Sequence, residues 1–221
     1  MALGLEAAHV DIEHAYAVCV TLFGVAAQQL LADAGYPNGE GFPTLTYTYP
    51  NSNKDALLAQ AIQAQLKQNL GINITLNGVE DQVYSSTRAE GSYDLIRHSW
   101  TADYDDPLLF LMLWSTSSNS IGLGWGAHAQ YDGYTANIGG EERSGLTWME
   151  SYDGLLYSIQ TTADPRERSR MIHELETLLM STGAVWPIYN YTDLFMIDDS
   201  VEGFFSIPLG YKYFMYCTVN E

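Results

Sequence analysis

The chain has 221 residues and a formal net charge of −18, because 27 acidic side chains stand against only 9 basic ones. Hydrophobic residues make up 47% of the chain and aromatic residues 13%, which is enough apolar material for a sizeable core and argues against an acidic disordered segment. The charge argues against nucleic acid as a partner, since phosphate contacts need clustered Lys and Arg, and against an anionic membrane surface. A neutral or cationic small molecule, or a protein, is the expected partner.

The apolar stretch at residues 15–27 is too short to span a bilayer as a helix, which takes about 20 apolar residues. Acidic residues and no Lys or Arg precede it, unlike the basic start of a signal peptide. We interpret the stretch as part of a buried helix, so direct membrane insertion of this chain is not expected. Cys19 and Cys217 could form one bridge or remain two reduced, buried thiols, and the sequence leaves both alternatives open.

Strand and helix signals alternate through the first half of the chain. A helix is expected to end over residues 28–34, where Gly35 supplies a left-handed C-cap. The patterns that follow predict a strand at 44–49, a helix at 53–70, a strand at 72–76, a short helix at 81–90 and a strand at 93–98. Strands joined by helices through short connections imply a parallel sheet with right-handed crossovers.

The second half of the chain is less regular. Residues 107–114 predict a short helix, with Asp105 and Asp106 as candidates for its N-cap. Residues 115–147 show no hydrophobic period, so we expect a functional loop or an insertion there. Further along, the sequence predicts a long helix from Asp164-Pro165 to Gly183, strands at 185–191 and 193–197, and a last strand near 213–219.

Catalytic and metal-binding signatures are weak. The histidines form no HExxH pattern, and the acidic run at 103–106 lacks the glycine and the distal glutamate of an EF-hand loop. No glycine-rich stretch follows a strand and opens a helix, so no metal and no cofactor is expected. The remaining enzymatic alternative is a carboxylate-dependent hydrolase centred on Asp103 and Asp106. Asp103 follows a predicted strand, the position at which open α/β sheets bind ligands.

One continuous stretch, residues 88–107, reads R-A-E-G-S-Y-D-L-I-R-H-S-W-T-A-D-Y-D-D-P. It resembles the C-terminal lobe of the extracytoplasmic solute-binding proteins of peptide ABC importers, the family-5 oligopeptide- and dipeptide-binding group. That lobe carries Arg, a Gly, Tyr-Asp and then Trp-x-x-Asp-Tyr-x-Asp/Glu-Pro in this order. The stretches LLADAGYPNGEGFPTLTYTY and DPRERSRMIHELETLLMSTGAVWPIYNYTD are similar to the family as well. Together the resemblance covers most of residues 28–114 and 151–221.

The resemblance implies a periplasmic-binding-protein-like lobe of class II type, an α/β fold with a mostly parallel sheet flanked by helices. Residues 28–200 would form the C-terminal lobe, with an insertion at 115–150. Residues 201–221 would be a tail that returns towards a first lobe, which is expected to be missing from the chain. Residues 1–27 do not resemble the family's lead-in and are expected to be an atypical N-terminal helical segment.

The resemblance also implies a set of ligand-binding residues. Asp103 matches the acidic residue that pairs with the α-amino group of the peptide. Arg88 and Arg97 match positions at which some members hold a ligand carboxylate, a task that suits the bidentate fork of a guanidinium. Trp100 matches a tryptophan that would wall a side-chain pocket, and Tyr104 follows Asp103 in the same motif.

Ordinary structural roles remain open for three of these residues. Arg97 could form an internal pair with Asp94 or Asp103, and Arg88 could lie exposed near a helix end. Trp100 could be plain core, as strand aromatics often are.

The function implied by the resemblance is uptake and not catalysis. An extracytoplasmic substrate-binding component would capture a peptide between two lobes, close about a hinge and deliver the peptide to an ABC permease in the membrane. A binding protein for another solute of the same family (nickel, a sugar or an opine) is the alternative. One departure from the family is local: His98 and Ser99 stand where it usually has small residues before the tryptophan.

Overall fold

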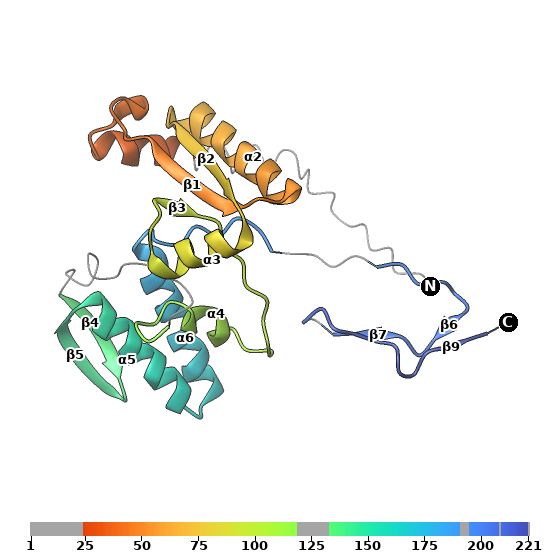
Figure 1. The fold of residues 1–221 in the computed structure, drawn as a ribbon. Coiled ribbons are helices and arrows are strands. Elements are labelled where there is room, and N and C mark those ends of the chain that lie inside the picture. The colour runs from red at the N-terminus through yellow and green to blue at the C-terminus, as the bar shows by residue number, and fades with distance from the viewer. Residues whose placement is uncertain (1–23, 119–132, 191–194, 208, 221) are drawn as a thin grey trace, which may run out of the picture. The chain divides into compact units, whose positions relative to one another are not determined.

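The structure is a computed structural model that describes residues 24–118, 133–190, 195–207 and 209–220 (Figure 1). The expected N-terminal helical segment up to residue 23, including Cys19, and part of the expected insertion lie outside the described residues. The chain divides into two compact units. The first unit comprises residues up to Arg88 together with Ser92–His98, and the second comprises Ala89–Gly91 with Ser99–Glu221.

The first unit is built on a three-stranded parallel sheet with the strand order β2-β1-β3. Helix α2 connects β1 to β2, and α3 connects β2 to β3, as Figure 1 shows. Helical residues 24–33 and a short 3-10 turn, η1, precede the sheet. The elements are η1 (Pro37–Gly39), β1 (Leu45–Pro50), α2 (Asn53–Leu70), β2 (Ile74–Val79), α3 (Asp81–Glu90) and β3 (Leu95–Ile96). The expected parallel α/β arrangement is therefore confirmed.

Local signals explain the ends of α2, which match the prediction. The Ser52 hydroxyl accepts a hydrogen bond from the Asp55 backbone N–H and so caps the first turn. Gly71 ends the helix with a φ of 72°, in the left-handed region that favours glycine. A Cβ at Gly71 would also collide with the backbone carbonyl of Asn38, so the packing of η1 demands a glycine there as well.

The core of the first unit lies between β1, β2 and α2. The central strand β1 buries three consecutive side chains, because both of its edges are paired and α2 packs against it. The predicted apolar stripe of α2 faces this core, with Ile62 buried and Leu58, Leu66 and Leu70 packed against it. The buried members of the core are Tyr47, Tyr49, Ala59, Ile62, Ile72 and Ile74.

The second unit is organised around three helices and an antiparallel hairpin. Helix α5 packs against both the hairpin and α6. The elements are α4 (Leu108–Met112), β4 (Tyr134–Ile138), β5 (Glu141–Leu146), α5 (Trp148–Thr161) and α6 (Pro165–Ser181). The predicted helix after Asp164 is confirmed: the Asp164 carboxylate accepts from the backbone N–H groups of Arg166 and Glu167.

The hairpin and α5 correct the expectation of an irregular segment after residue 114. Five residues of β4 pair with β5, a strand of mostly exposed polar side chains, which explains why no hydrophobic period was visible. The start of helix α5 is marked in the sequence by a capping box of Thr147 and Glu150. The side chain of each residue accepts a hydrogen bond from the backbone N–H of the other. The apolar side chains of α5 then recur at helical spacing and enter the core.

Two strand predictions near the C-terminus are wrong in the part that is described. Residues 184–190 and 195–198 form no strand, because a β-rich composition makes a strand only where another strand offers its backbone. The expected strand near 213–219 is split by a turn in which the Cys217 N–H donates to the Phe214 carbonyl. The C-terminal residues form two short antiparallel ribbons, β6 (Val201–Glu202) with β9 (Thr218–Val219) and β7 (Phe205–Ser206) with β8 (Lys212–Tyr213).

Within the described ranges, no helix has the length and apolar character needed to cross a bilayer. Cys217 is half-buried, and because Cys19 lies outside the described residues, both alternatives for the cysteines remain open.

The core of the second unit yields a stability prediction at Trp148. Its ring is 1% exposed, stacks on Tyr152 with ring centroids 4.7 Å apart, and donates from Nε1 to the Leu178 carbonyl of α6. Trp148→Ala should lower the free energy of unfolding by about 3–5 kcal/mol, because it leaves a large cavity in the core of the second unit. Urea denaturation measures the loss. Tyr157→Ala, at an exposed position of the same helix, is the control, and equal losses in both variants would contradict this packing.

Candidate functional site

The five residues expected to bind ligand fall into both units. Arg88 and Arg97 belong to the first unit, whereas Trp100, Asp103 and Tyr104 belong to the second.

Arg97 lies directly after β3, at the carboxyl edge of the parallel sheet. Its backbone N–H donates to the Thr48 carbonyl of β1, 2.9 Å away. Its side chain is only 8% exposed, and its Nε lies 2.6 Å from Oδ1 of Asp55 in the first turn of α2. The two atoms form an ion pair without the alignment of a hydrogen bond. An internal pair was one of the two alternatives for Arg97, but Asp55 is a partner that the sequence did not indicate.

Arg88 lies in the last turn of α3 and is half-buried, so the exposed surface position considered for it is not what the structure shows. Its guanidinium carbon is 5.6 Å from the centroid of the Tyr84 ring, a cation–π distance. Its Nη1 is 3.3 Å from Nε2 of His98. Because a guanidinium only donates, this contact requires Nε2 to be the acceptor, and so a neutral His98 with its proton on Nδ1.

Two tyrosines complete this group of side chains. The Tyr84 hydroxyl donates to the Arg97 carbonyl, and burial raises the pKa of Tyr84 despite the opposing charge of Arg88. Burial also raises the pKa of Tyr93. The Tyr93 hydroxyl and Nε of Arg88 are both buried, and neither has a hydrogen-bond partner among the residues that the structure describes. We call this group the arginine cluster: Asp55, Tyr84, Arg88, Tyr93, Arg97 and His98.

His98 has the strongest electrostatic perturbation in the arginine cluster. Burial of the ring, together with the neighbouring charges of Arg88 and Arg97, lowers its pKa from 6.5 to about 4. The imidazole is therefore neutral at neutral pH, in agreement with its role as an acceptor for Arg88. The arginine cluster, as defined by its residues, holds two guanidinium cations and one carboxylate, that of Asp55. The arginine cluster therefore has a surplus of positive charge and unused donors, which suits an anionic group such as a carboxylate.

Sequence reasoning missed Asp55, Tyr84 and Tyr93 as members of the arginine cluster. A signal existed for Tyr84, because it stands four residues before Arg88 and shares its face of a predicted helix. Asp55 had none, since its partner Arg97 lies two crossovers away in the sequence.

The second group surrounds a bend at residues 103–105 that precedes α4. Asp103 is exposed there, so its carboxylate is accessible to a ligand from solvent. Tyr104 is exposed as well, with its hydroxyl 4.0 Å from Sδ of Met112, and Trp100 is half-buried.

Asp106 has a structural role, as the capping interpretation predicted. Its Oδ1 accepts from the Leu108 backbone N–H, and its Oδ2 lies 2.6 Å from Nη2 of Arg168 in α6. Both oxygens are thus engaged in holding α4 to α6. Asp106 is therefore not free to act as a second catalytic carboxylate with Asp103, and this argues against the hydrolase alternative.

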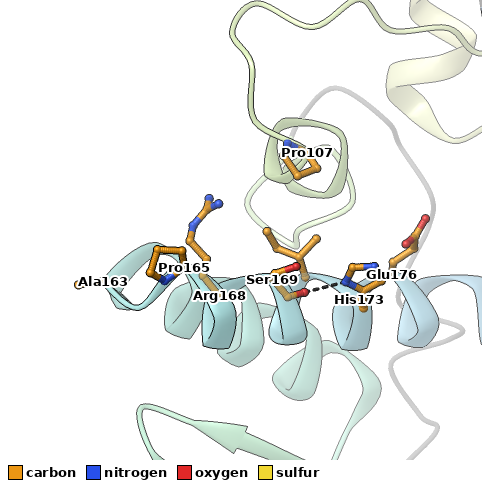
Figure 2. Close-up of a pocket in the computed structure, with 8 residues that line it drawn as sticks. Pro107, Ala163, Pro165, Arg168, Ser169, His173 and Glu176 are labelled. Carbon is orange, nitrogen blue, oxygen red and sulfur yellow. Dashed lines mark hydrogen bonds between the residues drawn. The ribbon is translucent and has the colours of Figure 1, made fainter.

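A surface cavity of about 380 Å³ lies beside α6 in the second unit (Figure 2). None of the expected ligand-binding residues lines it. His173 donates from Nδ1 to the Ser169 carbonyl of its own helix, and Arg168 is held by Asp106, so these side chains already have partners. The lining residues are Pro107, Ala163, Pro165, Arg168, Ser169, Ile172, His173 and Glu176. In the described part of the chain, His, Cys, Asp and Glu side chains nowhere gather in a group of three that could hold a metal ion.

The fold is that of a periplasmic binding protein. The sequence model of the bacterial extracellular solute-binding proteins, family 5 (middle part), matches residues 24–122. This part of the chain therefore belongs to family 5 of the extracellular solute-binding proteins, and to the oligopeptide- and dipeptide-binding type within it.

Similarity to individual proteins extends beyond this segment. The chain is 26% identical over 174 residues to the dipeptide-binding protein DppE of Bacillus subtilis, a match that covers 79% of the chain and 28% of DppE. Among solved structures it is similar to a periplasmic oligopeptide-binding protein, OppAIV of an oligopeptide ABC transporter from Borrelia burgdorferi, with 32% identity and a TM-score of 0.57 over 71% of the chain and 27% of OppAIV. It is also similar to the Escherichia coli murein tripeptide-binding protein MppA, with 26% identity and a TM-score of 0.62 over 83% of the chain and 31% of MppA.

The chain thus spans less than a third of the length of these relatives. The structural matches confirm the expected periplasmic-binding-protein-like α/β fold.

The ion pair of the arginine cluster gives a second stability prediction. Asp55→Asn should lower the free energy of unfolding by about 3–5 kcal/mol, because it leaves the buried Arg97 guanidinium without its counter-charge. Chemical denaturation measures the loss. Asp81→Asn removes an exposed carboxylate from the first turn of α3 and should change stability little. Similar losses in both variants would contradict a buried pair.

The lowered pKa of His98 predicts a pH dependence of stability. The unfolded chain takes up a proton at His98 near pH 6.5, but the folded chain resists protonation until about pH 4. The stability conferred by the neutral ring is complete above pH 6.5 and is lost as the pH falls from 6.5 to 4. The loss should be roughly 1–2 kcal/mol, because solvent screens a half-buried ring.

Denaturation curves at pH 7 and pH 5 for the wild type and His98→Gln check this sign. The variant should lose less stability on acidification than the wild type. An equal loss in both proteins would show that His98 does not carry the effect.

Proposed function

We propose that the chain is part of the substrate-binding component of an ABC transporter, which captures peptides outside the cytoplasm and passes them to a membrane permease. The observation that carries the proposal is the pair of charged sites. The arginine cluster has a positive surplus for a carboxylate, and Asp103 has an accessible carboxylate for an ammonium group. A peptide with free ends carries both of these charges, and charge-assisted hydrogen bonds to them are the strong ones.

The relatives support a peptide as the ligand. Their names state a dipeptide, a murein tripeptide and an oligopeptide as what they bind. The chain spans less than a third of the length of these relatives, and we extend their peptide binding to it as part of this proposal. Within it, Arg88 and Arg97 of the first unit are the candidate contacts for a carboxylate. In the second unit, Asp103 is the candidate contact for an ammonium group, and Trp100 and Tyr104 are the candidates for apolar contact.

The proposal includes the organisation expected from the sequence. Residues 28–200 form the C-terminal lobe with an insertion at 115–150, and residues 201–221 are a tail towards a first lobe. Of the proposed N-terminal segment, residues 1–27, only residues 24–27 lie within the described ranges, and they are helical. The permease and the extracytoplasmic location follow from the relatives, one of which belongs to an oligopeptide ABC transporter and is named periplasmic.

Binding is proposed in place of catalysis because the relatives are named as binding proteins and Asp106 is committed to its cap and to Arg168. Nickel, a sugar or an opine is the alternative ligand of the same kind of protein.

Calorimetry of the chain with tri-alanine tests the proposal at Asp103. Asp103→Asn should weaken binding about 10- to 100-fold, the value of a charge-assisted hydrogen bond of about 1.5–3 kcal/mol. Asp105→Asn changes a neighbouring exposed carboxylate of the same bend and is the matched control, with affinity expected to stay within about threefold of the wild type.

N-acetyl tri-alanine lacks the ammonium group, so comparing the two peptides in the wild type and in Asp103→Asn forms a double-mutant cycle between that group and Asp103. It should bind weakly to the wild type and lose nothing more in Asp103→Asn. Binding of nickel, a sugar or an opine in place of the peptides would overturn the proposal, as would hydrolysis of the peptide.

A further inference from the structure

His98 is a titratable member of the arginine cluster that has no role in the proposed function. His98 lies beside Arg88 at the carboxyl edge of the sheet, with Nε2 3.3 Å from Nη1. The contact exists only while Nε2 is unprotonated, because protonation turns the acceptor into a second cation facing a guanidinium. His98 is therefore bound to Arg88 in one protonation state and repelled by it in the other.

The charged groups around His98 determine whether its ring is neutral or protonated. Arg88 from α3 and the adjacent Arg97 are the charges that act on the ring. Asp55 from α2 faces Arg97 and neutralises that charge in part. A ligand carboxylate beside Arg88 would bring the negative charge that this side of the arginine cluster lacks.

The arginine cluster also contains hydrogen-bond donors that have no acceptor among the described residues. Nε of Arg88 and the Tyr93 hydroxyl are buried donors without a partner among the described residues, and buried donors are costly to leave unmet. Arg88 also acts on the titration of Tyr93, which places the two side chains in one electrostatic neighbourhood. A carboxylate offers two oxygens with about four acceptor positions, enough for a guanidinium edge and a further donor.

We infer that His98 is a positioning residue of a carboxylate subsite: it holds Arg88 through Nη1 and, when a ligand carboxylate takes over that donor, accepts a proton at Nε2. This inference rests on the proposed peptide function. The proton comes from solvent, and Nε2–H then becomes a donor to the same carboxylate, so no other bond is made or broken. Carboxylate binding is thereby linked to the uptake of a proton.

The linkage has a definite sign. Without ligand, burial of the ring, together with the charges of Arg88 and Arg97, holds the pKa of His98 at about 4. A bound carboxylate raises the pKa of His98 because it favours the imidazolium form. Affinity for a ligand with a free carboxylate therefore increases as the pH falls from 7.5 towards 5.5. A ligand whose carboxylate is blocked has no such dependence.

Calorimetry of the chain with tri-alanine and with tri-alanine amide, at pH 7.5 and 5.5, tests the inference. Tri-alanine should bind about three- to tenfold more tightly at pH 5.5 than at pH 7.5, and the amide should not. Titrations in two buffers that differ in ionisation enthalpy should show proton uptake for tri-alanine alone. His98→Gln should remove both the pH effect and the proton uptake, whereas His173→Gln, at an exposed position of α6, should keep both.

NMR of the histidine side chains supplies a readout that needs no ligand. The His98 resonance can be assigned by its loss in His98→Gln. It should titrate far below pH 6.5 in the wild type, and in Arg88→Gln the pKa of His98 should be higher. Titration near 6.5 in both proteins would overturn the inference. An unchanged pH effect on affinity in His98→Gln would do the same.

The outcomes separate this inference from the proposed function. If tri-alanine and its amide bind equally well at both pH values and both need Asp103, the peptide function stands and the role of His98 is wrong. If neither peptide binds at either pH, the proposed function fails, and the carboxylate subsite fails with it.

Discussion

The ion pair between Asp55 and Arg97 is the contact on which the arginine cluster depends. It joins the first turn of α2 to the residue after β3, and both side chains are almost fully buried. The pair neutralises one of the two guanidinium groups in this region, so that a second cation, Arg88, can be half-buried nearby without an uncompensated double charge. The remaining surplus of one positive charge is the feature on which the proposed carboxylate site rests.

The parallel sheet is what brings these charges together. Strand β1 pairs with β2 on one side and with β3 on the other, so the carboxyl ends of all three strands meet at one edge. Helix α2 starts from that edge after β1, and Arg97 reaches it at the end of β3. Ligand sites of open α/β sheets lie at this edge for the same topological reason.

Much of the first unit could be predicted because its signals are local. Helices α2 and α3 match their expected bounds. In α2 a cap, an apolar stripe and a terminal glycine all lie within the helix or next to it. The polar hairpin β4–β5 could not be predicted, because its strands carry no apolar alternation and are defined by their pairing. Helix α5 was missed although the capping box at Thr147 and Glu150 was present.

By itself, the sequence determined the α/β class, the helices α2, α3 and α6, and Arg88, Arg97 and Asp103 as candidate residues, because periodicity, caps and a motif are all properties of neighbouring residues. Only the tertiary structure decided which charges are partners. Asp55 meets Arg97, Tyr84 meets the Arg97 carbonyl, and Asp106 meets Arg168, each across a crossover or between helices. Electrostatic energy depends on distance in space, and the separation of two residues along the chain does not specify that distance once the chain has folded.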